Sequence, residues 1–503
     1  MWRNIFIISL SIQYLPIEAQ YTRADYNWLI GSDQFNDVNK IQIIFNDLGL
    51  DRIIGIQADE KNRIPANYSN TAVSNSKGEL RVFSTGCYIA NEKYDTLRGS
   101  HNLISKRKLD YCRSWVGWPI DQSDLLLPWP DLEGSYKLFY TNWGNPYINF
   151  DEDSLMLFPS FSEALFSCNI HTDTQNEIFL ESCWDTVLAD TVCESYITAC
   201  YQDNIKDWWI VNPRAGSNCY FVFVFNHEGV KVYSKQCIGP FVGRKDNFGQ
   251  AKFSPNRNKY ARFNGTQLIL LDFNPSDGSF SNPIELRNSV NDSINTRGGI
   301  AFSSNSRYLY AFNITKVYQY DLFEPDVKGS EILIRDSYID TLAGIHVNYH
   351  HGLLAPDGRI YISEMWWSNK LSVIESPNCK GTLCNFKPGE ISLPGLNFFN
   401  LPNLPTYRVW DDSDVCLVNS SNENKSEYGN FYILDLNNYI LRRNYKYDGF
   451  TDYKMKIIDI EGRLMKQFHG MPDNIALDPI KGGIYFILLE SEGKTMFQKI
   501  LIL

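Results

Sequence analysis

The sequence predicts an all-β protein, and three observations support this fold class. A stretch made of a buried residue, a tight turn and a strand occurs three times, at residues 253–260, 302–308 and 354–361. Each copy leads into a second short strand, and helical periodicity is almost absent. Short strands that recur with a period of about 50 residues are typical of the blades of a β-propeller. We therefore expect a propeller, with further strands beyond it.

The turn within each repeat has a physical basis. Pro255 and Pro356 preset φ, while the Asn, Asp and Gly residues that follow tolerate the conformations that a chain reversal needs. The second strands are expected at residues 268–273, 317–322 and 371–374. These three regular copies define the last blades of the propeller.

Earlier blades are expected from short aromatic and β-branched runs. They lie at residues 26–31 and 41–45, 72–84, 125–127 with 137–141, and 207–211 with 220–225. Counting such units between residues 21 and 405 gives about seven blades, with six or eight as alternatives. The predicted propeller spans residues 20–405.

A change of composition follows the propeller. Residues 406–427 are polar and poor in apolar side chains, as expected of a linker. Short strands resume in residues 428–503 without the blade period, and turns at Glu461-Gly462 and Glu492-Gly493 join two pairs as hairpins. We expect a small Ig-like β-sandwich here.

The ends and the charge of the chain bear on its location. Residues 1–19 combine Arg3, an apolar run and Ala19, which is the pattern of a cleavable secretory signal. No other run approaches the roughly 20 apolar residues of a membrane-spanning helix. A formal net charge of −11 argues against a nucleic-acid-binding protein. We expect an exported protein that is not transmembrane.

Eleven cysteines fit an oxidising compartment. Cys379 and Cys384 are close enough in sequence to close one loop by a disulfide. Six cysteines between residues 168 and 237 indicate an irregular insertion, and their pairing cannot be deduced. The odd total leaves at least one thiol unpaired or intermolecular.

The C-terminal hairpins resemble a known family. Residues 455–464 and 482–488 are similar to the C-terminal sorting domain of bacterial type IX secretion, with Gly462, Gly483, Tyr485, Gly493 and Lys499 as the matching residues. The Asn-Pro dipeptide usual at the domain start is missing. The repeats also resemble secreted WD40-like or YVTN-like propellers of Bacteroidetes. The resemblance implies Sec export, contact with the type IX machinery, and release or attachment at the cell surface.

Two groups of residues are candidates for ligand chemistry. His346, His350 and His351, with Glu364 on the following strand, could bind a transition metal, because imidazole and carboxylate are suitable ligands. Their spacing matches no established ligand pattern, so we favour ordinary loop residues and predict no metal or other cofactor. The Trp pairs invite a sugar-stacking hypothesis, although packing between sheets is the commoner role of such aromatics. These pairs are Trp208-Trp209 and Trp366-Trp367.

The sequence lacks a motif that fixes a reaction. There is no Gly-x-Ser-x-Gly elbow and no phosphate-binding glycine loop. No catalytic residue is therefore predicted, and we expect an extracellular module that binds a glycan or a protein. Two alternatives stay open: a propeller enzyme acting on polysaccharide or peptide, and a structural adhesin or motility-associated surface protein. Convergent His and acidic side chains at one funnel mouth would favour the enzyme, and an exposed apolar patch around residues 168–237 would favour the adhesin.

Overall fold

The chain forms two compact units, residues Met1–Val418 and Asn419–Leu503, which are described separately. The computed structural model describes residues 23–31, 38–57, 69–100, 112, 118–142, 161–243, 246, 248–288, 297–336, 338–340, 345–365, 368–399, 401–408, 416, 432–435, 440–443, 454–459, 463–470, 472–476, 483–491 and 494–502. The predicted signal peptide, residues 1–19, and most of the predicted linker lie outside the described residues.

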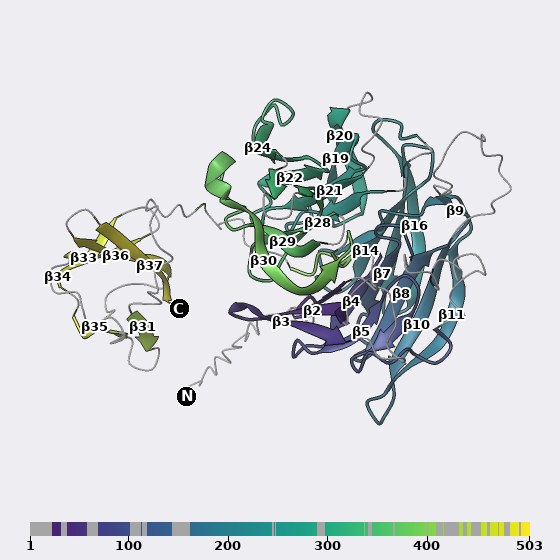
Figure 1. Cartoon of the computed structure of the whole chain (residues 1–503), viewed down its shortest axis with the longest axis horizontal. Coiled ribbons are helices and arrows are strands. Elements are labelled where there is room, and N and C mark those ends of the chain that lie inside the picture. The colour runs from purple at the N-terminus through teal and green to yellow at the C-terminus, as the bar shows by residue number, and fades with distance from the viewer. Residues whose placement is uncertain are drawn as a thin grey trace, which may run out of the picture. The chain divides into compact units, whose positions relative to one another are not determined.

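Seven antiparallel sheets of three or four strands make up the first unit within its described residues, and we number them as blades 1 to 7 (Figure 1). The predicted all-β propeller is thereby confirmed. Blade 1 contains β1 (Asn27–Ile30), β2 (Val38–Asn46) and β3 (Gly49–Gln57), and blade 2 contains β4 (Thr71–Ser74), β5 (Leu80–Ser84) and β6 (Ile89–Asn91). Blade 3 contains β7 (Asp124–Pro128), β8 (Ser135–Thr141), β10 (Leu165–Thr172) and β11 (Ile178–Leu188).

Blades 4 to 7 are regular four-stranded meanders. Blade 4 contains β13 (Thr198–Tyr201), β14 (Trp208–Pro213), β15 (Cys219–Asn226) and β16 (Gly229–Cys237), and blade 5 contains β17 (Gln250–Phe253), β18 (Lys259–Phe263), β19 (Gln267–Asn274) and β20 (Ser279–Asn288). Blade 6 contains β21 (Gly298–Phe302), β22 (Tyr308–Asn313), β23 (Lys316–Asp321) and β24 (Ile332–Asp336). Blade 7 contains β27 (Tyr349–Leu354), β28 (Ile360–Glu364), β29 (Ser368–Ile374) and β30 (Phe386–Asn397). Two-stranded sheets pair β9 (Phe161–Ser162) with β12 (Val192–Cys193), and β25 (Tyr338–Asp340) with β26 (Ile345–Val347).

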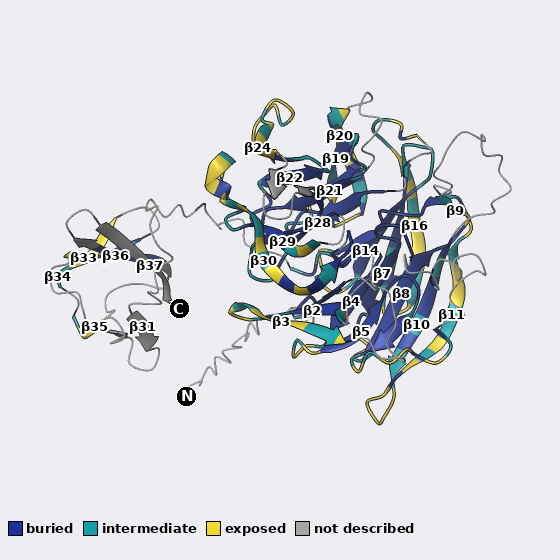
Figure 2. Cartoon of the chain, in the orientation of Figure 1, coloured by how far each residue is buried: buried dark blue, intermediate teal, exposed yellow. Residues whose placement is uncertain are grey.

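The first strand of each blade lies innermost, beside the first strands of neighbouring blades. Contacts join β1 to β4, β4 to β7, β13 to β17, β17 to β21, and β21 to β27. Inner and middle strands are buried along most of their length, whereas the outer strands β3, β11, β16, β20, β24 and β30 carry the exposed positions (Figure 2). The inner strands are nevertheless not uniformly apolar, since β17 contains Gln250 and Lys252 and β27 contains His350 and His351.

The three sequence repeats are the hairpins between the first and second strands of blades 5, 6 and 7. Arg257, Ser306 and Gly358 occupy the same turn position in the three hairpins, and all have a left-handed backbone, with φ of 64°, 58° and 79°. Glycine adopts this conformation without a steric penalty, so the third copy has the residue best suited to it. The repeat therefore encodes a turn geometry.

A segment that follows blade 7 returns through the middle of the ring. We call residues 398–399 and 401–408 the channel segment. The backbone N–H of Asn403 donates to Asn70, just before blade 2, and that of Thr406 donates to Ala199 on blade 4. The Asn403 side chain donates to the carbonyls of Asp124 and Ile197, at 2.8 and 2.9 Å. Buried residues 401–405 thus fill the central channel.

The same segment closes the ring at its other end. Arg408 forms two hydrogen bonds to the Asp25 carboxylate, which precedes β1, at 2.7 and 2.9 Å. The long outer strand β30 also lies against β2 and β3 of blade 1 (Figure 1). Each blade, in the described residues, is built from one continuous stretch of chain. Closure therefore rests on packing and on the channel segment, and the first unit extends past residue 405.

In its described residues, the second unit has two antiparallel sheets. One contains β31 (Tyr432–Asp435), β32 (Ile440–Arg443) and β35 (Asn474–Ala476), and the other contains β34 (Leu464–His469), β33 (Lys454–Asp459), β36 (Gly483–Ser491) and β37 (Lys494–Ile502) in that order. The predicted hairpins are those of β33 with β34 and of β36 with β37. Gly462 and Gly493, at their turns, lie outside the described residues.

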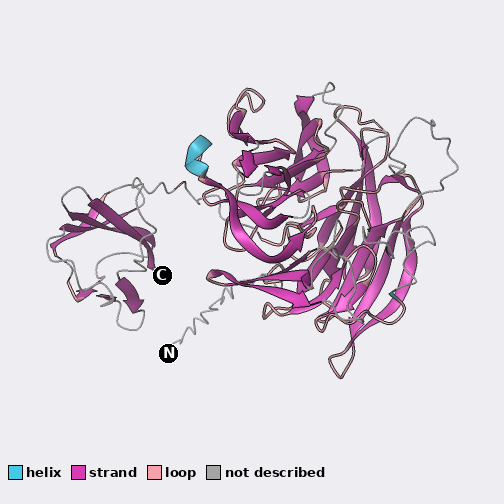
Figure 3. Ribbon diagram, viewed as in Figure 1, coloured by secondary structure: helices cyan, strands magenta, loops and turns pink. Residues whose placement is uncertain are grey.

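The cysteine pairing differs from the predicted one. Cys379 is bonded to Cys416, and Cys384 is a buried free thiol, so the predicted Cys379–Cys384 bridge is wrong. Cys384 ends a short 3-10 helix, Gly381–Cys384, which is cyan in Figure 3. Its side chain lies in the apolar core formed by blades 6 and 7, where burial raises the pKa of the thiol to about 11.

The remaining disulfides lie within regular structure or tie a loop. They join Cys87 to Cys112, Cys168 to Cys183, and Cys219 to Cys237, while Cys193 and Cys200 are buried free thiols. The second pair links β10 to β11 and the third links β15 to β16. The predicted irregular insertion at residues 168–237 is therefore wrong, because these cysteines belong to blades 3 and 4. Among the described residues, no helix is long and apolar enough to cross a membrane.

The contacts of the channel segment predict how the loss of one side chain changes the free energy of unfolding. Asn403→Ala removes a side chain that bonds carbonyls of two blades and accepts a hydrogen bond from Gln122. Leaving these buried groups unpaired should lower the free energy of unfolding by about 2–4 kcal/mol in chemical denaturation. Asn204→Ala is the control, since Asn204 is exposed and bonds only within its own turn. An equal loss in both variants would contradict a central role for the segment.

Candidate functional site

The candidate site lies beside the channel segment, where the first strand of blade 7 begins. It contains His350 and His351 from β27 and Asp121 from the turn before β7 of blade 3. The three side chains are 0%, 2% and 0% exposed for His350, His351 and Asp121. Blades 3 and 7 are not neighbours in the ring, so the cluster spans the channel.

A local irregularity turns both imidazoles in the same direction. Consecutive residues of a regular strand point to opposite faces of the sheet. The pairing of β27 with β28 shifts register between Tyr349 and Gly352, and the rings of His350 and His351 stack with centroids 4.0 Å apart and planes 17° apart. Bulges of this kind commonly re-aim a side chain.

Glycine allows the neighbouring blade to approach this irregular stretch. A Cβ placed on Gly299, in β21, would lie 2.0 Å from the carbonyl oxygen of His350. Any larger residue would push blades 6 and 7 apart at the level of the cluster. The position of the histidines therefore depends on a glycine in the adjacent blade.

Asp121 is fixed by the residue that follows it. The Gln122 side chain donates to the carbonyl of Ala251 in blade 5 and accepts from the backbone N–H of the same residue, at 3.1 and 2.7 Å. Its amide also donates to Asn403 of the channel segment at 3.0 Å. Gln122 has a left-handed backbone, with φ of 46°. This turn carries Asp121 across the channel toward blade 7.

The distances bring three potential ligand atoms to one point. The Nε2 atoms of His350 and His351 lie 3.5 and 3.6 Å from Oδ2 of Asp121. All three atoms lie within 4.8 Å of one another, and within the described residues they form a group with the composition of a metal site. Among the residues that the structure describes, none is a hydrogen-bond partner for either carboxylate oxygen of Asp121 or for either Nε2 atom.

Charge in the cluster is set by burial and by neighbours. Burial alone would raise the pKa of Asp121, but the two histidines outweigh this effect and lower it below the usual value. Burial, together with His350, lowers the pKa of His351 to about 4, so this ring is neutral at neutral pH. Nη1 of Arg297 lies 3.7 Å from Oδ2 of Asp121 and adds a positive charge at the edge of the site.

A second buried ionic group lies near blades 4 and 5. Arg262 of β18 pairs with Asp246, and the Tyr196 hydroxyl donates to the same carboxylate at 2.8 Å. The Arg262 guanidinium also lies 4.4 Å from the Tyr196 ring centroid. These contacts give each charge a partner, as a buried ion pair requires, and favour a structural role.

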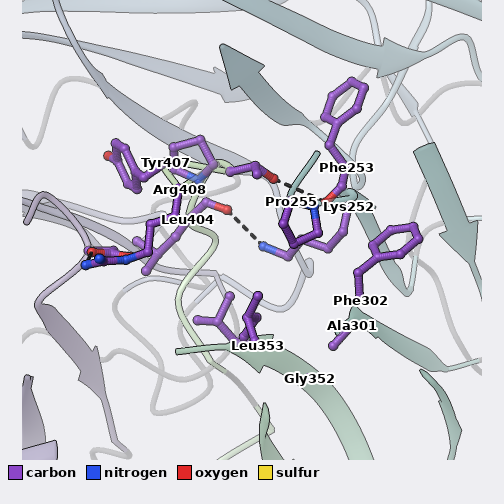
Figure 4. A pocket seen from close by; sticks show the side chains of 14 residues that line it. Lys252, Phe253, Pro255, Ala301, Phe302, Gly352, Leu353, Leu404, Tyr407 and Arg408 are labelled. Carbon is purple, nitrogen blue, oxygen red and sulfur yellow. Dashed lines mark hydrogen bonds and ion pairs between the residues drawn. The ribbon is translucent and has the colours of Figure 1, made fainter. Parts of the chain in front are cut away.

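A pocket of about 60 Å³ lies beside the channel segment and is partly open to solvent (Figure 4). Lys252 lines it, and its Nζ donates to the carbonyl of Leu404 at 2.9 Å. Burial lowers the pKa of Lys252 to about 7. The pocket therefore presents a buried amine beside the channel segment.

The other predicted site residues divide into three groups. Glu364 accepts hydrogen bonds from Ser368 and Ser372 at 2.7 and 2.8 Å, and it takes no part in the histidine cluster. The side chain of His346, in β26, lies outside the described part of the chain, as do Trp366 and Trp367. Tyr485 is buried in β36, which begins at Gly483, and its β37 neighbour across the ladder is Ile500, next to Lys499.

Trp208 and Trp209 are both core residues. Trp208 is 0% exposed and stacks on Tyr201, with ring centroids 3.9 Å apart. Trp209, 2% exposed, points to the opposite face and donates through Nε1 to the carbonyl of Pro275 in the next blade at 2.7 Å. The sugar-stacking hypothesis is therefore wrong for this pair, because inter-blade packing occupies both indoles.

Sequence reasoning missed the partners of the two histidines. Asp121 and Arg297 lie in separate blade connections, and neither has a local motif. The one available signal was their position: both immediately precede the first strand of a blade, where connections approach the channel. Lys252 and Asn403 were also missed, because apolar neighbours gave no sign of a buried amine or amide.

The comparisons with known proteins find only distant structural likenesses. No family model and no curated protein matches the chain. Similar solved structures include a candidate 6-phosphogluconolactonase from Bacteroides fragilis, with 10% identity, a TM-score of 0.39, and coverage of 75% of this chain and 98% of that one. Another is the Swd1 β-propeller domain of Myceliophteria thermophila, with 8% identity, a TM-score of 0.34, and coverage of 68% and 92%.

A third similar structure is PorZ, a bacterial surface component of the type IX secretion system of Porphyromonas gingivalis. The identity is 10% and the TM-score 0.34, with 92% of this chain and 63% of that one covered. The structural neighbours thus include β-propeller proteins and one component of type IX secretion. At these identities and TM-scores the likenesses carry no argument about what this chain does.

The buried amine of Lys252 predicts a pH dependence of the free energy of unfolding. Its pKa is about 7 in the folded protein and near the ordinary value of 10.5 in the unfolded chain. The unfolded state therefore binds more protons between these values, so this amine makes stability rise as the pH rises from 7 to 9.5. Relative to Lys252→Met, the free energy of unfolding of the native protein should increase by about 1 kcal/mol per pH unit in this window. Parallel pH profiles for the two proteins would show that the amine is not buried.

Proposed function

We propose that the protein is exported through type IX secretion and acts outside the cell as a binding module. Three observations support export: the signal-like residues 1–19, the hairpins of the second unit with their sorting-domain motif, and four disulfides in the first unit. Disulfides persist in oxidising compartments. The C-terminal unit would be the part that the secretion machinery binds.

The closed channel is the observation that carries the binding hypothesis. In a propeller, a central funnel is the usual place for a substrate, and loops on the two faces are the usual place for a partner. Here the channel segment occupies the middle of the ring, and the pocket beside it has a volume of about 60 Å³. A glycan or protein ligand would therefore meet the faces or the outer rim of the ring.

The enzyme hypothesis has one observation in its favour. His350, His351 and Asp121 converge, as expected of a catalytic centre in a propeller. They are nevertheless closed to solvent, with the most accessible of them, His351, only 2% exposed. A reaction at this cluster would require the channel segment to move, so we keep catalysis as the second candidate.

The adhesin hypothesis also has a specific observation. Large apolar side chains are exposed on the outer strands of blades 3 and 4, which contact each other through β11 and β16. The exposed fractions are 44% for Phe179, 38% for Trp184, 46% for Val232 and 54% for Tyr233. Apolar side chains gathered on adjoining edges favour a protein partner over a glycan.

The export proposal is tested by moving the second unit. Fusing residues 419–503 to a periplasmic reporter should deliver that reporter to the surface of a bacterium that has the type IX system. The same unit with Ile487→Pro should leave the reporter in the periplasm, because Ile487 is buried in β36, which pairs with β33 on one side and β37 on the other, and a proline there removes a ladder hydrogen bond. Cell fractionation and protease shaving give the readout. A reporter that stays inside with the native unit would refute the sorting assignment.

The binding proposal is tested by thermal shift on the full chain. Soluble glycans and purified extracellular proteins are added in turn, and a specific ligand at 100 times its Kd should stabilise the folded state by about 2.7 kcal/mol. Product release measured in the same samples would move the assignment to an enzyme. If no ligand produces a shift or a product, both the binding hypothesis and the enzyme hypothesis are contradicted, and the adhesin hypothesis is the one that remains.

A further inference from the structure

The tautomer of His350 is the starting point for an inference about the buried cluster. Nδ1 of this ring lies 2.7 Å from the carbonyl oxygen of Phe399, in the channel segment. A backbone carbonyl only accepts hydrogen bonds, so Nδ1 must hold the proton. In the neutral ring, Nε2 then presents a lone pair, and this lone pair faces the Asp121 carboxylate.

Two electron-rich atoms thus face each other in a closed site. Nε2 of His350 is 3.5 Å from Oδ2 of Asp121, and neither atom has a hydrogen-bond partner among the described residues. Nε2 of His351 lies 3.6 Å from the same oxygen, and it too has no such partner in the described part of the chain. Buried polar atoms that repel one another are costly unless a positive centre lies between them.

The distances fit a metal ion as that positive centre. Zinc binds imidazole nitrogen at 2.0–2.1 Å and carboxylate oxygen at 2.0–2.2 Å, so two ligand atoms in a tetrahedral shell are about 3.3–3.5 Å apart. The two measured separations, 3.5 and 3.6 Å, are close to this spacing. The bond from His350 to Phe399 is also the second-shell contact that metal-binding histidines commonly make to a backbone carbonyl.

We infer that Asp121, His350 and His351 form a site for a divalent transition-metal ion of the zinc class. The ion would join blade 3 to blade 7 across the channel, with a water molecule in the remaining coordination position. Because the Phe399 carbonyl orients His350, the channel segment is part of the second shell. The site is thereby coupled to closure of the ring, which makes its role structural.

Arg297 defines the competing arrangement. Its guanidinium, 3.7 Å from Asp121, could balance the carboxylate while a proton on one imidazole takes the place of the ion. The guanidinium lies against Phe248 and Phe399, 4.2 and 4.8 Å from their ring centroids, which places its charge at the margin of the cluster. The two arrangements differ in one measurable quantity, the metal content.

The test measures metal in the full-length protein. After reconstitution with zinc and desalting, the native chain should hold about one equivalent by elemental analysis. Asp121→Asn and His350→Gln should each weaken zinc binding by about 100-fold or more in competition with a chromophoric chelator. Glu364→Gln and His171→Gln should retain it, because Glu364 bonds two serines and His171 bonds Ser135 and Glu181 away from the cluster.

Cobalt provides a readout that does not depend on the variants folding. Co²⁺ bound to the native protein should give the strong visible absorption of a tetrahedral centre without a thiolate charge-transfer band, because the three free cysteines are not among the ligands. Removing the metal with a chelator should lower the Tm, and zinc should restore it. Native protein that takes up no zinc or cobalt would overturn the inference, as would a full equivalent retained by both Asp121→Asn and His350→Gln.

Discussion

Hydrogen bonding inside the channel is the constraint on which the rest of the first unit depends. An extended segment cannot be buried unless its backbone groups find partners. In the channel segment, the backbone N–H of Asn403 donates to Asn70 and that of Thr406 donates to Ala199. The Asn403 side chain adds bonds to the carbonyls of Asp124 and Ile197. Since the described blades share no strand, these bonds and the Asp25–Arg408 pair hold the ring together.

The closed channel also explains the character of the candidate site. Asp121 and the two histidines meet because one turn of blade 3 and one bulge of blade 7 reach into the same space, and the Phe399 carbonyl fixes the orientation of His350. A cluster held in this way gains rigidity and loses access to solvent. This combination suits a cross-link between distant blades better than it suits turnover of a polymer.

Much of the fold could be predicted from local sequence, and little of the site could. Turns such as Pro255-Asn256-Arg257 and the alternation of strands are local signals, so the blades and the C-terminal hairpins were foreseen. Asp121 meets His350 only because the ring closes, and no spacing encodes that contact. The predicted Cys379–Cys384 disulfide is wrong for the same reason. Proximity in sequence favours it, but the 3-10 helix places Cys384 in the core, and Cys379 is bonded to Cys416 instead.

The channel segment has a consequence for the order of folding. Asp25 and Arg408, which bond to each other, are 383 residues apart in sequence. Contacts over such a separation form late, because the entropy of closing the loop must be lost first. A nascent chain that ends before Arg408 lacks the residues that hold the first and last blades to the channel segment. The ring can therefore close only after Arg408 has been synthesised, when most of the 503 residues are already in place.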